Sequence, residues 1–240
     1  MPRIALFTTC LVDQFFPGVG RAALKLLRRA GCRVEFPPNQ TCCGQPFFNM
    51  GHREAARPLA RRTIEVLRPY DAAVLPSGSC AAMIRVHYPE LFRHEPRWQA
   101  AALEVGRKTF ELSEYLVNVL GRPDAAGRSE GTVTVHDSCH LLRELRIQAE
   151  PRTLLRAAGR RIAEMEDAAV CCGFGGAFAV KMGPISGRML SSKLDRIEAA
   201  GAPVVCAGDV SCLMHIGGGL SRRGSAVRAV HVAEIAAEGL

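Results

Sequence analysis

A pair of adjacent cysteines followed by glycine occurs twice in this chain, at positions 42–44 and 171–173. In both copies another cysteine stands before the pair, separated from it by the same 31 residues. A further cysteine follows each pair, after 36 residues in the first copy and 39 in the second. Eight of the ten cysteines therefore form two quartets: Cys10, Cys42, Cys43 and Cys80, then Cys139, Cys171, Cys172 and Cys212.

Four thiolates that meet at one point can hold an iron-sulfur cluster or a tetrahedral zinc ion. Disulfides are a poor alternative, because bonding adjacent cysteines to one another closes a strained ring. Structural zinc sites usually carry closely spaced C-x-x-C pairs, and neither quartet contains one. The spacing therefore favours one 4Fe-4S cluster in each half, with zinc as the lesser alternative and uncoordinated thiols as the remaining one.

Several glycines accompany the cysteines. Glycine lets the backbone approach a ligand closely, and successive backbone N–H groups can point at an anionic group. We therefore expect a cofactor-binding role for five of them: Gly44, Gly78, Gly173, Gly175 and Gly176.

Four other residues need a separate interpretation. His136 and His140 flank Cys139 and could tune or ligate a cluster, although the position matching His140 in the first half is Leu11, which favours a supporting role. Cys32 and Cys206 have no cysteine counterpart in the other half. We expect them to be buried or half-buried structural thiols.

The composition is that of a globular protein with a substantial core, since 48% of the 240 residues are hydrophobic. No run approaches the ~18 apolar residues of a membrane span, and the first residues are too short an apolar run for a signal peptide, so we expect a cytoplasmic protein without a cleaved leader. The net charge is +8. The basic residues are scattered and aromatic residues are few, so we expect no nucleic-acid partner.

The elements that must position the cysteines alternate between strands and helices. Short apolar runs at 4–8, 33–36 and 71–75 predict strands, and the first of them delivers Cys10 to the end of a sheet. Helical periodicity covers 19–30, which Gly31 terminates, and 52–67. A turn at 76–80 leads into another helix, 110–120 is interpreted as a helix that closes the half, and 89–108 is left unassigned.

The pattern restarts after a segment rich in glycine, alanine and proline. A strand is expected at 132–136, a helix ending near 154–158 and a further strand from 161. We therefore predict an α/β fold of two homologous halves with mainly parallel sheets, related by a pseudo-twofold axis. The domains would be residues 1–121 and 132–240, with 122–131 as the linker. The glycine-containing segment 18–23 is similar to a dinucleotide-binding fingerprint, but it lies far from its strand and is not repeated in the second half.

The duplicated motif resembles the CCG cysteine-rich domain family, whose members include a heterodisulfide reductase subunit, the iron-sulfur subunit of glycolate oxidase and lactate utilization proteins. The stretches that look most like the lactate utilization branch are 136–140 (HDSCH), 171–178 (CCGFGGAF) and 209–213 (DVSCL). The resemblance implies an iron-sulfur electron-transfer component of an L-lactate-oxidising complex. It also implies two partners, a second iron-sulfur protein and a third component, and no complete active site in this chain alone.

The sequence departs from the family pattern at one position in each half. Where the full motif has the first cysteine of Cys-x-x-Cys, this chain has Ser77 and Asp209. The departure favours a cubane 4Fe-4S centre, or an oxygen ligand from Asp209, over the noncubane cluster of the heterodisulfide reductases. Two alternative functions stay open: a heterodisulfide-reductase-like thiol-disulfide oxidoreductase and a zinc-stabilised interaction module.

Overall fold

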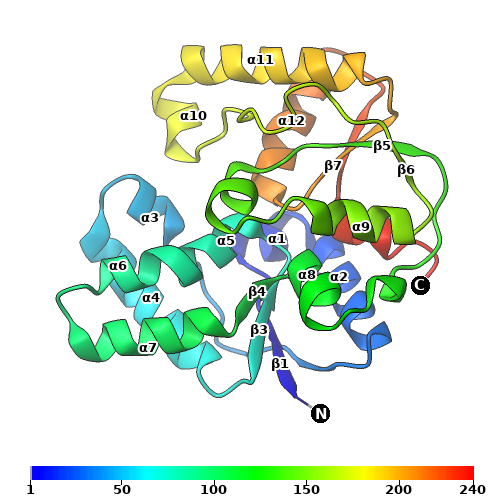
Figure 1. Ribbon diagram of the computed structural model, residues 1–240. Coiled ribbons are helices and arrows are strands. Elements are labelled where there is room, and N and C mark those ends of the chain that lie inside the picture. The colour runs from blue at the N-terminus through cyan, green and yellow to red at the C-terminus, as the bar shows by residue number, and fades with distance from the viewer. Residues whose placement is uncertain (1) are drawn as a thin grey trace.

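The computed structural model describes residues 2–240 and contains two four-stranded parallel sheets (Figure 1). The first sheet has the order β2-β1-β3-β4, and the second has the matching order β6-β5-β7-β8. The predicted α/β fold with two similar parallel halves is confirmed. The strands are β1 (Arg3–Leu6), β2 (Arg33–Glu35), β3 (Ala72–Leu75), β4 (Thr109–Glu111), β5 (Thr132–Val135), β6 (Arg161–Ile162), β7 (Val204–Ala207) and β8 (Arg228–His231).

Helices connect consecutive strands, as parallel pairing requires. The first half contains α1 (Cys10–Phe15), α2 (Pro17–Arg29), α3 (Gln45–Asn49), α4 (Arg53–Leu67), α5 (Gly78–Ala82), the π-helix η1 (Met83–His87), α6 (Tyr88–Leu91), α7 (Pro96–Arg107), α8 (Leu112–Glu114) and the π-helix η2 (Tyr115–Val119). The remainder contains the 3₁₀-helix η3 (Pro123–Ala125), the π-helix η4 (His140–Glu144), α9 (Ala149–Ala157), α10 (Ala177–Lys181), α11 (Gly183–Ala199), α12 (Val210–Arg222) and α13 (Val232–Ala236).

The segment 110–120 differs from the predicted single helix. Its first residues belong to β4, which pairs with β3 over Ala73–Thr109 to Leu75–Glu111. Only the part from Leu112 onward is helical. Thr109 and Phe110 are residue types that favour strands, and pairing with the buried strand β3 makes this segment a strand. Helical periodicity in the sequence does not reveal that pairing. The unassigned segment 89–108 forms the end of α6 and all of α7.

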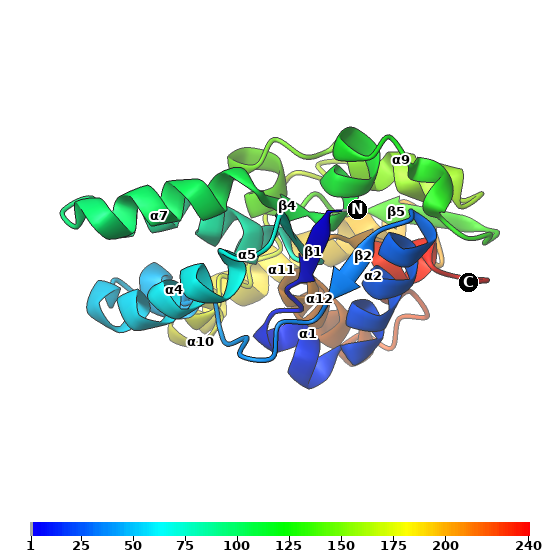
Figure 2. The same cartoon turned by 90° about the horizontal axis from the view of Figure 1, so that it is seen from below.

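The segment between the two sheets packs against both halves and is not a flexible linker. Ala125 and Ala126 are buried, and the Gly127 N–H donates to the carbonyl oxygen of Ala236 at 2.7 Å. One hydrophobic cluster combines residues of α2, α9 and α13, so the C-terminal helix completes the core of the first half. Figures 1 and 2 show α2 and α9 at the same end of the molecule. The halves therefore share a core.

The topology brings the cysteines to one edge of each sheet. In the first sheet β1 lies between β2 and β3, and the connections from β1 and β3 leave in opposite directions along the sheet. Such a switch point leaves a crevice at the carboxyl ends of the strands, where α/β proteins bind their ligands. Cys10 follows β1, the Cys42–Cys43 pair follows β2 and Cys80 follows β3. The second quartet follows β5, β6 and β7 in the same way.

The last helices of the two halves begin in the same way. Glu111 before α8 and His231 before α13 are N-caps of capping boxes, in which the third helical residue, Glu114 or Glu234, bonds back to the N-cap N–H. The Nδ1 atom of His231 accepts the Ala233 N–H at 3.0 Å. Burial of this imidazole lowers the pKa of His231 to about 4.

The buried cap at His231 gives the protein a pH-dependent stability. An unfolded histidine has a pKa near 6.5, so the unfolded state binds more protons between pH ~6.5 and ~4, and stability falls as pH drops through that window. The loss approaches roughly 3 kcal/mol. Urea unfolding of the wild type and His231→Asn at pH 7.5 and pH 4.5 measures it, because asparagine caps the helix without titrating. We expect the free energy of unfolding of the wild type to exceed that of His231→Asn at pH 7.5, and this difference to shrink at pH 4.5. A difference that does not change with pH would contradict the assignment.

Candidate metal centre

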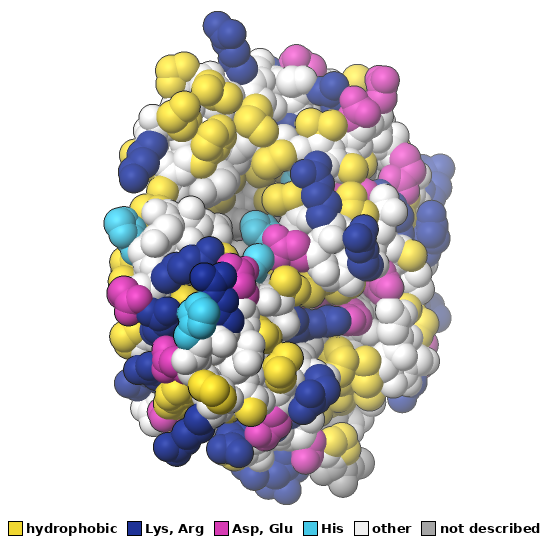
Figure 3. Space-filling view, turned by 60° about the vertical axis from the view of Figure 1, so that its left-hand side comes forward, with side chains coloured by type: hydrophobic (Ala, Val, Ile, Leu, Met, Phe, Trp, Pro, Cys, Tyr) yellow, Lys and Arg dark blue, Asp and Glu magenta, His cyan; other side chains and the backbone are white. Residues whose placement is uncertain are grey.

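All eight cysteines of the two quartets line one cavity of about 240 Å³. The cavity lies between the halves, and its wall includes residues of α3 and of the segment that leads into α10. The space-filling view shows a hollow in the surface on the side to which α3 and α10 project in Figure 1, with hydrophobic side chains gathered beside it (Figure 3). The fold therefore brings each predicted quartet together and also brings the quartets next to each other.

Sulfur atoms of the first quartet lie close together. The Sγ atoms of Cys43 and Cys80 are 3.3 Å apart. The neighbouring thiols of Cys10 and Cys43 stabilise the thiolate of Cys42 and lower the pKa of Cys42 to about 3. The same interactions raise the pKa of Cys10 and Cys43. The site thus already stabilises one thiolate, the form of cysteine that binds metals.

The second quartet is arranged in a similar way. The neighbouring thiols of Cys139 and Cys172 stabilise the Cys171 thiolate and lower the pKa of Cys171 to about 2. Cys172 and, to a smaller extent, the nearby His136 lower the pKa of Cys212 to about 5. Two of the four cysteines here are poised as thiolates. The first cysteine of each adjacent pair, Cys42 or Cys171, is thus the one with the strongly lowered pKa in both halves.

The glycine after each cysteine pair is required by the local backbone. Gly44 and Gly173 have φ angles of 86° and 90°, in the left-handed region that favours glycine. Their N–H groups donate to the Sγ atoms of Cys42 at 3.4 Å and Cys171 at 3.3 Å. A Cβ atom at Gly173 would lie only 2.8 Å from the Ser186 carbonyl oxygen. These two glycines hold a backbone donor against the most acidic sulfur of each quartet.

The other three glycines predicted at the site have different surroundings. Gly175 and Gly176 line the cavity beside the second quartet. Gly78 lies where the halves meet: its N–H donates to the Gly208 carbonyl oxygen at 3.3 Å, and a Cβ there would lie 1.8 Å from a methyl group of Leu141. The Gly78 N–H therefore bonds across the contact between the halves.

Ser77 and Asp209, which replace a cysteine of the family pattern, are helix N-caps. Ser77 Oγ accepts the Cys80 N–H at 3.4 Å at the start of α5. Asp209 caps α12 by accepting bonds from Ser211, and its other oxygen accepts the Ser79 N–H of the first half at 2.7 Å. Both carboxylate oxygens of Asp209 are thus engaged in hydrogen bonds. These two positions fix the helices that carry Cys80 and Cys212.

The two histidines that flank Cys139 lie beside the second quartet, whereas Cys32 and Cys206 lie away from the cavity. His136 is buried and has a ring nitrogen within 4.8 Å of the Sγ atoms of Cys172 and Cys212. His140 is half-buried, with Nδ1 3.7 Å from Cys139 Sγ and Nε2 3.7 Å from Glu144. Cys32 and Cys206 lie outside the cavity wall, and Cys206 is fully buried in β7.

Lys193 of α11 is a contributor that the sequence did not reveal. Its side chain is fully buried, and Nζ donates to the carbonyl oxygens of Asp167 at 2.8 Å and Ala168 at 3.3 Å. These carbonyls precede Cys171 by a few residues, so the ammonium group fixes the loop that presents the second cysteine pair. Nothing in an amphipathic helix marks one lysine as buried, which is why periodicity missed it.

The donor set fits a metal centre built on sulfur. Eight thiols border one partly enclosed space, all ten cysteines are free, and thiolates select iron-sulfur clusters or zinc. The group His136, Cys172 and Cys212 could also hold a single metal ion. Among residues 2–240, no helix has the length and apolar character needed to cross a membrane.

Comparison with known proteins identifies similar sequences over almost the whole chain. A model of the CCG cysteine-rich domain matches residues 4–85 and again residues 133–217. Relatives called lactate utilization protein A are 44% identical in Macrococcus caseolyticus, 45% in Shouchella clausii and 43% in Bacillus subtilis. Each match covers 97% of this chain and 95–98% of the relative. A crystal structure of a putative Asp/Glu racemase from Yersinia pestis aligns over 99% of this chain and 96% of that chain, with a TM-score of 0.39 and 10% identity.

Proposed function

This chain belongs to the CCG cysteine-rich domain family, and on that premise we propose that it is an iron-sulfur electron-transfer component of lactate utilization. The role would be exercised within a complex that oxidises L-lactate, beside a second iron-sulfur protein and a third component. The observation that carries the proposal is the convergence of both cysteine quartets on one cavity. The full-length similarity to proteins named for lactate utilization supports the metabolic setting.

Each half supplies a complete set of four sulfur ligands for a 4Fe-4S cluster. Such a cluster, when bound, accepts and releases single electrons at a potential set by its hydrogen bonds and its exposure to solvent. The Gly44 and Gly173 N–H groups donate to ligand sulfurs and would stabilise negative charge there. Cys43 and Cys80 also pack in a hydrophobic cluster with Phe7, which keeps water from that side of the first site.

The lining of the cavity supports the proposed dependence on partners. Its wall consists of the eight cysteines with small, polar and apolar side chains. The segment 18–23, which is similar to a dinucleotide-binding fingerprint, lies inside α2, and its Gly18 packs against Glu234. With no recognised flavin or nicotinamide motif in the sequence, we propose that a partner oxidises lactate and that this chain relays the electrons.

Metal analysis of anaerobically purified protein tests the proposal. Two 4Fe-4S clusters predict about eight iron atoms and eight acid-labile sulfides per chain, with visible absorption that bleaches on reduction. Electron paramagnetic resonance (EPR) of the reduced protein then reports the clusters directly. Zinc in place of iron, without acid-labile sulfide, would overturn the proposal and favour the zinc-stabilised interaction module.

The position of the cavity between the halves also favours a second candidate, reduction of a small disulfide. Two electrons and two protons would convert the disulfide into two thiols, and a reduced iron-sulfur partner protein would supply the electrons. A substrate in the cavity would lie beside both quartets. Thiol release by the reconstituted, chemically reduced chain would support this activity, whereas no thiol release at saturating disulfide would exclude it.

A further inference from the structure

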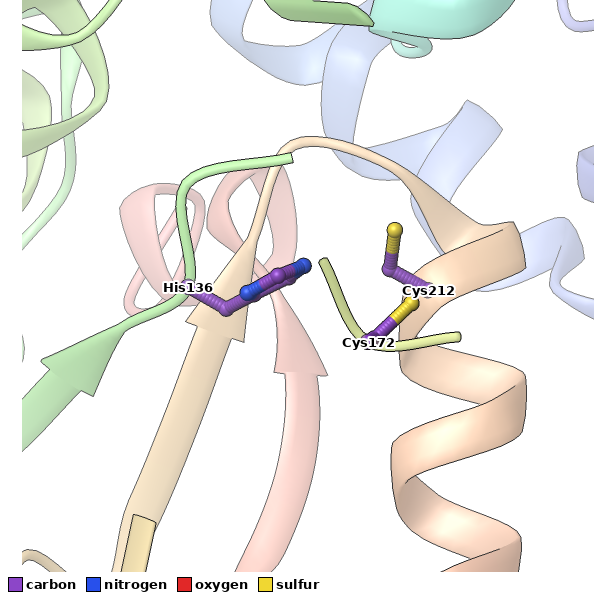
Figure 4. A group of neighbouring side chains, drawn as sticks. All are labelled: His136, Cys172 and Cys212. Carbon is purple, nitrogen blue, oxygen red and sulfur yellow. The ribbon is translucent and has the colours of Figure 1, made fainter. Parts of the chain in front are cut away.

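His136 is a buried histidine whose ring nitrogens have no hydrogen-bond partner in the part of the chain that the structure describes. The side chain is 2% exposed, and both Nδ1 and Nε2 lack a partner. The residue directly follows β5, and Figure 4 shows its imidazole pointing toward Cys172 and Cys212. One nitrogen lies within 4.8 Å of both sulfurs. The imidazole is therefore directed at the second cysteine quartet.

An unsatisfied buried imidazole is costly, because its nitrogens have given up hydrogen bonds to water without a replacement. The neighbouring charged groups do not relieve it. Asp137, the next residue, is bonded to Arg152 at 2.7 Å and to Gln148 at 2.9 Å. Lys193 is engaged with the carbonyls before Cys171. The groups nearest the ring are the sulfurs of Cys172 and Cys212, and neither makes a hydrogen bond with it. A group bound among these cysteines is therefore the remaining candidate partner.

The duplication provides an internal comparison. The shift of 129 residues that superposes Cys43 on Cys172 superposes Phe7 on His136. Phe7 is fully buried after β1 and packs in one cluster with Cys43 and Cys80, the counterparts of Cys172 and Cys212. The place beside the sulfurs is thus occupied by the phenyl ring of Phe7 in the first half and by the imidazole of His136, which can bind a metal, in the second. Packing alone would be served by phenylalanine in both.

We propose that His136 coordinates the metal centre of the second half through a ring nitrogen, together with Cys172 and Cys212. This inference rests on the proposed function. The first centre would then have only sulfur donors, and the second would have a mixed sulfur and nitrogen set. Iron-sulfur centres with histidine ligands, such as the Rieske type, have higher reduction potentials than plant-type centres held by cysteine alone. The centre held by His136 would therefore be reduced first, and electrons entering the chain would collect there.

Pulsed EPR of the anaerobic, cluster-containing protein tests the coordination. In protein grown with ¹⁵N-histidine, a nitrogen bound to the reduced centre changes its hyperfine coupling from the ¹⁴N to the ¹⁵N pattern. We expect one strongly coupled histidine nitrogen in the wild type, and its loss in His136→Phe, which copies the first half. Phe7→Leu, a change at the matching place, should retain the coupling. The isotope comparison on the wild type needs no variant, so absence of a coupled histidine nitrogen overturns the proposal even if His136→Phe does not fold. His140→Leu, which copies Leu11 of the first half, should retain the coupling, because His140 lies beside Cys139.

The outcomes separate this inference from the proposed function. Protein that contains iron and sulfide but shows no strongly coupled histidine nitrogen overturns the role of His136 and leaves the electron-transfer proposal standing. Persistence of the coupling in His136→Phe overturns it as well. Absence of iron and sulfide overturns the proposed function first. In a potentiometric titration, the more easily reduced signal should shift to lower potential in His136→Phe and stay in place in Phe7→Leu.

Discussion

Replacing Cys43 with serine is expected to lower the iron and acid-labile sulfide of the purified chain to about half and to remove one of two EPR signals. Cys43 is buried, and its Sγ is 3.3 Å from Cys80 Sγ, so the substitution removes a central sulfur ligand of the first quartet. Serine is a poor ligand for iron-sulfur clusters, which are held by thiolates. The second quartet has its own four sulfurs and should keep its cluster. Iron and sulfide analysis with EPR of the same sample measures both effects.

The counterpart Cys172→Ser should remove the other signal, again with a loss of about half the iron. Cys206→Ser is the matched control, because Cys206 is as buried as the ligands but lies in β7, outside the cavity wall. It should keep the full metal content. Identical spectra in the wild type and both ligand variants would show that the quartets are assigned incorrectly. Equal loss in Cys206→Ser would show that the effect comes from folding.

The quartets could be predicted from the sequence because the cysteines come in a repeated order after short apolar runs. In a parallel sheet the carboxyl ends of neighbouring strands share an edge, so cysteines with 31 or more residues between them can converge. Their meeting in one cavity could not be predicted in this way. That arrangement depends on how the halves pack, which is decided by contacts such as Gly78 against Leu141 and Ser79 with Asp209.

Tertiary context accounts for what the fold prediction could not show. The alanines of the segment 122–131, which lies between the two sheets, are buried because α13 and α9 provide surfaces for them to pack on. The strand β4 was hidden inside a helical pattern because a three-residue strand is too short to show its own period. Similarly, the burial of Lys193 and the missing hydrogen-bond partners of His136 are properties of the assembled site.

Replacing Asp209 with alanine is expected to destabilise the protein by roughly 2–4 kcal/mol, as the sum of a lost helix cap and an unsatisfied buried N–H. Asp209 is 2% exposed and caps α12 through Ser211, while its other oxygen accepts the Ser79 N–H from the first half. Ser79 lies in the first turn of α5, which packs on η4 through Ala81, Ala82 and Leu141. Removal of the carboxylate therefore weakens both α12, the helix that contains Cys212, and the contact between the halves.

Ser77→Ala is the matched control, because Ser77 is the corresponding cap in the first half but bonds only within that half, to Cys80 and Ser79. It should cost only about 1 kcal/mol, the usual value of an N-cap. Urea unfolding of the metal-free proteins under reducing conditions measures both changes without a contribution from a cluster. The excess loss in Asp209→Ala then reports the bond across the halves. Equal destabilisation by the two substitutions would mean that the Ser79 N–H finds another partner and that Asp209 acts as a helix cap alone.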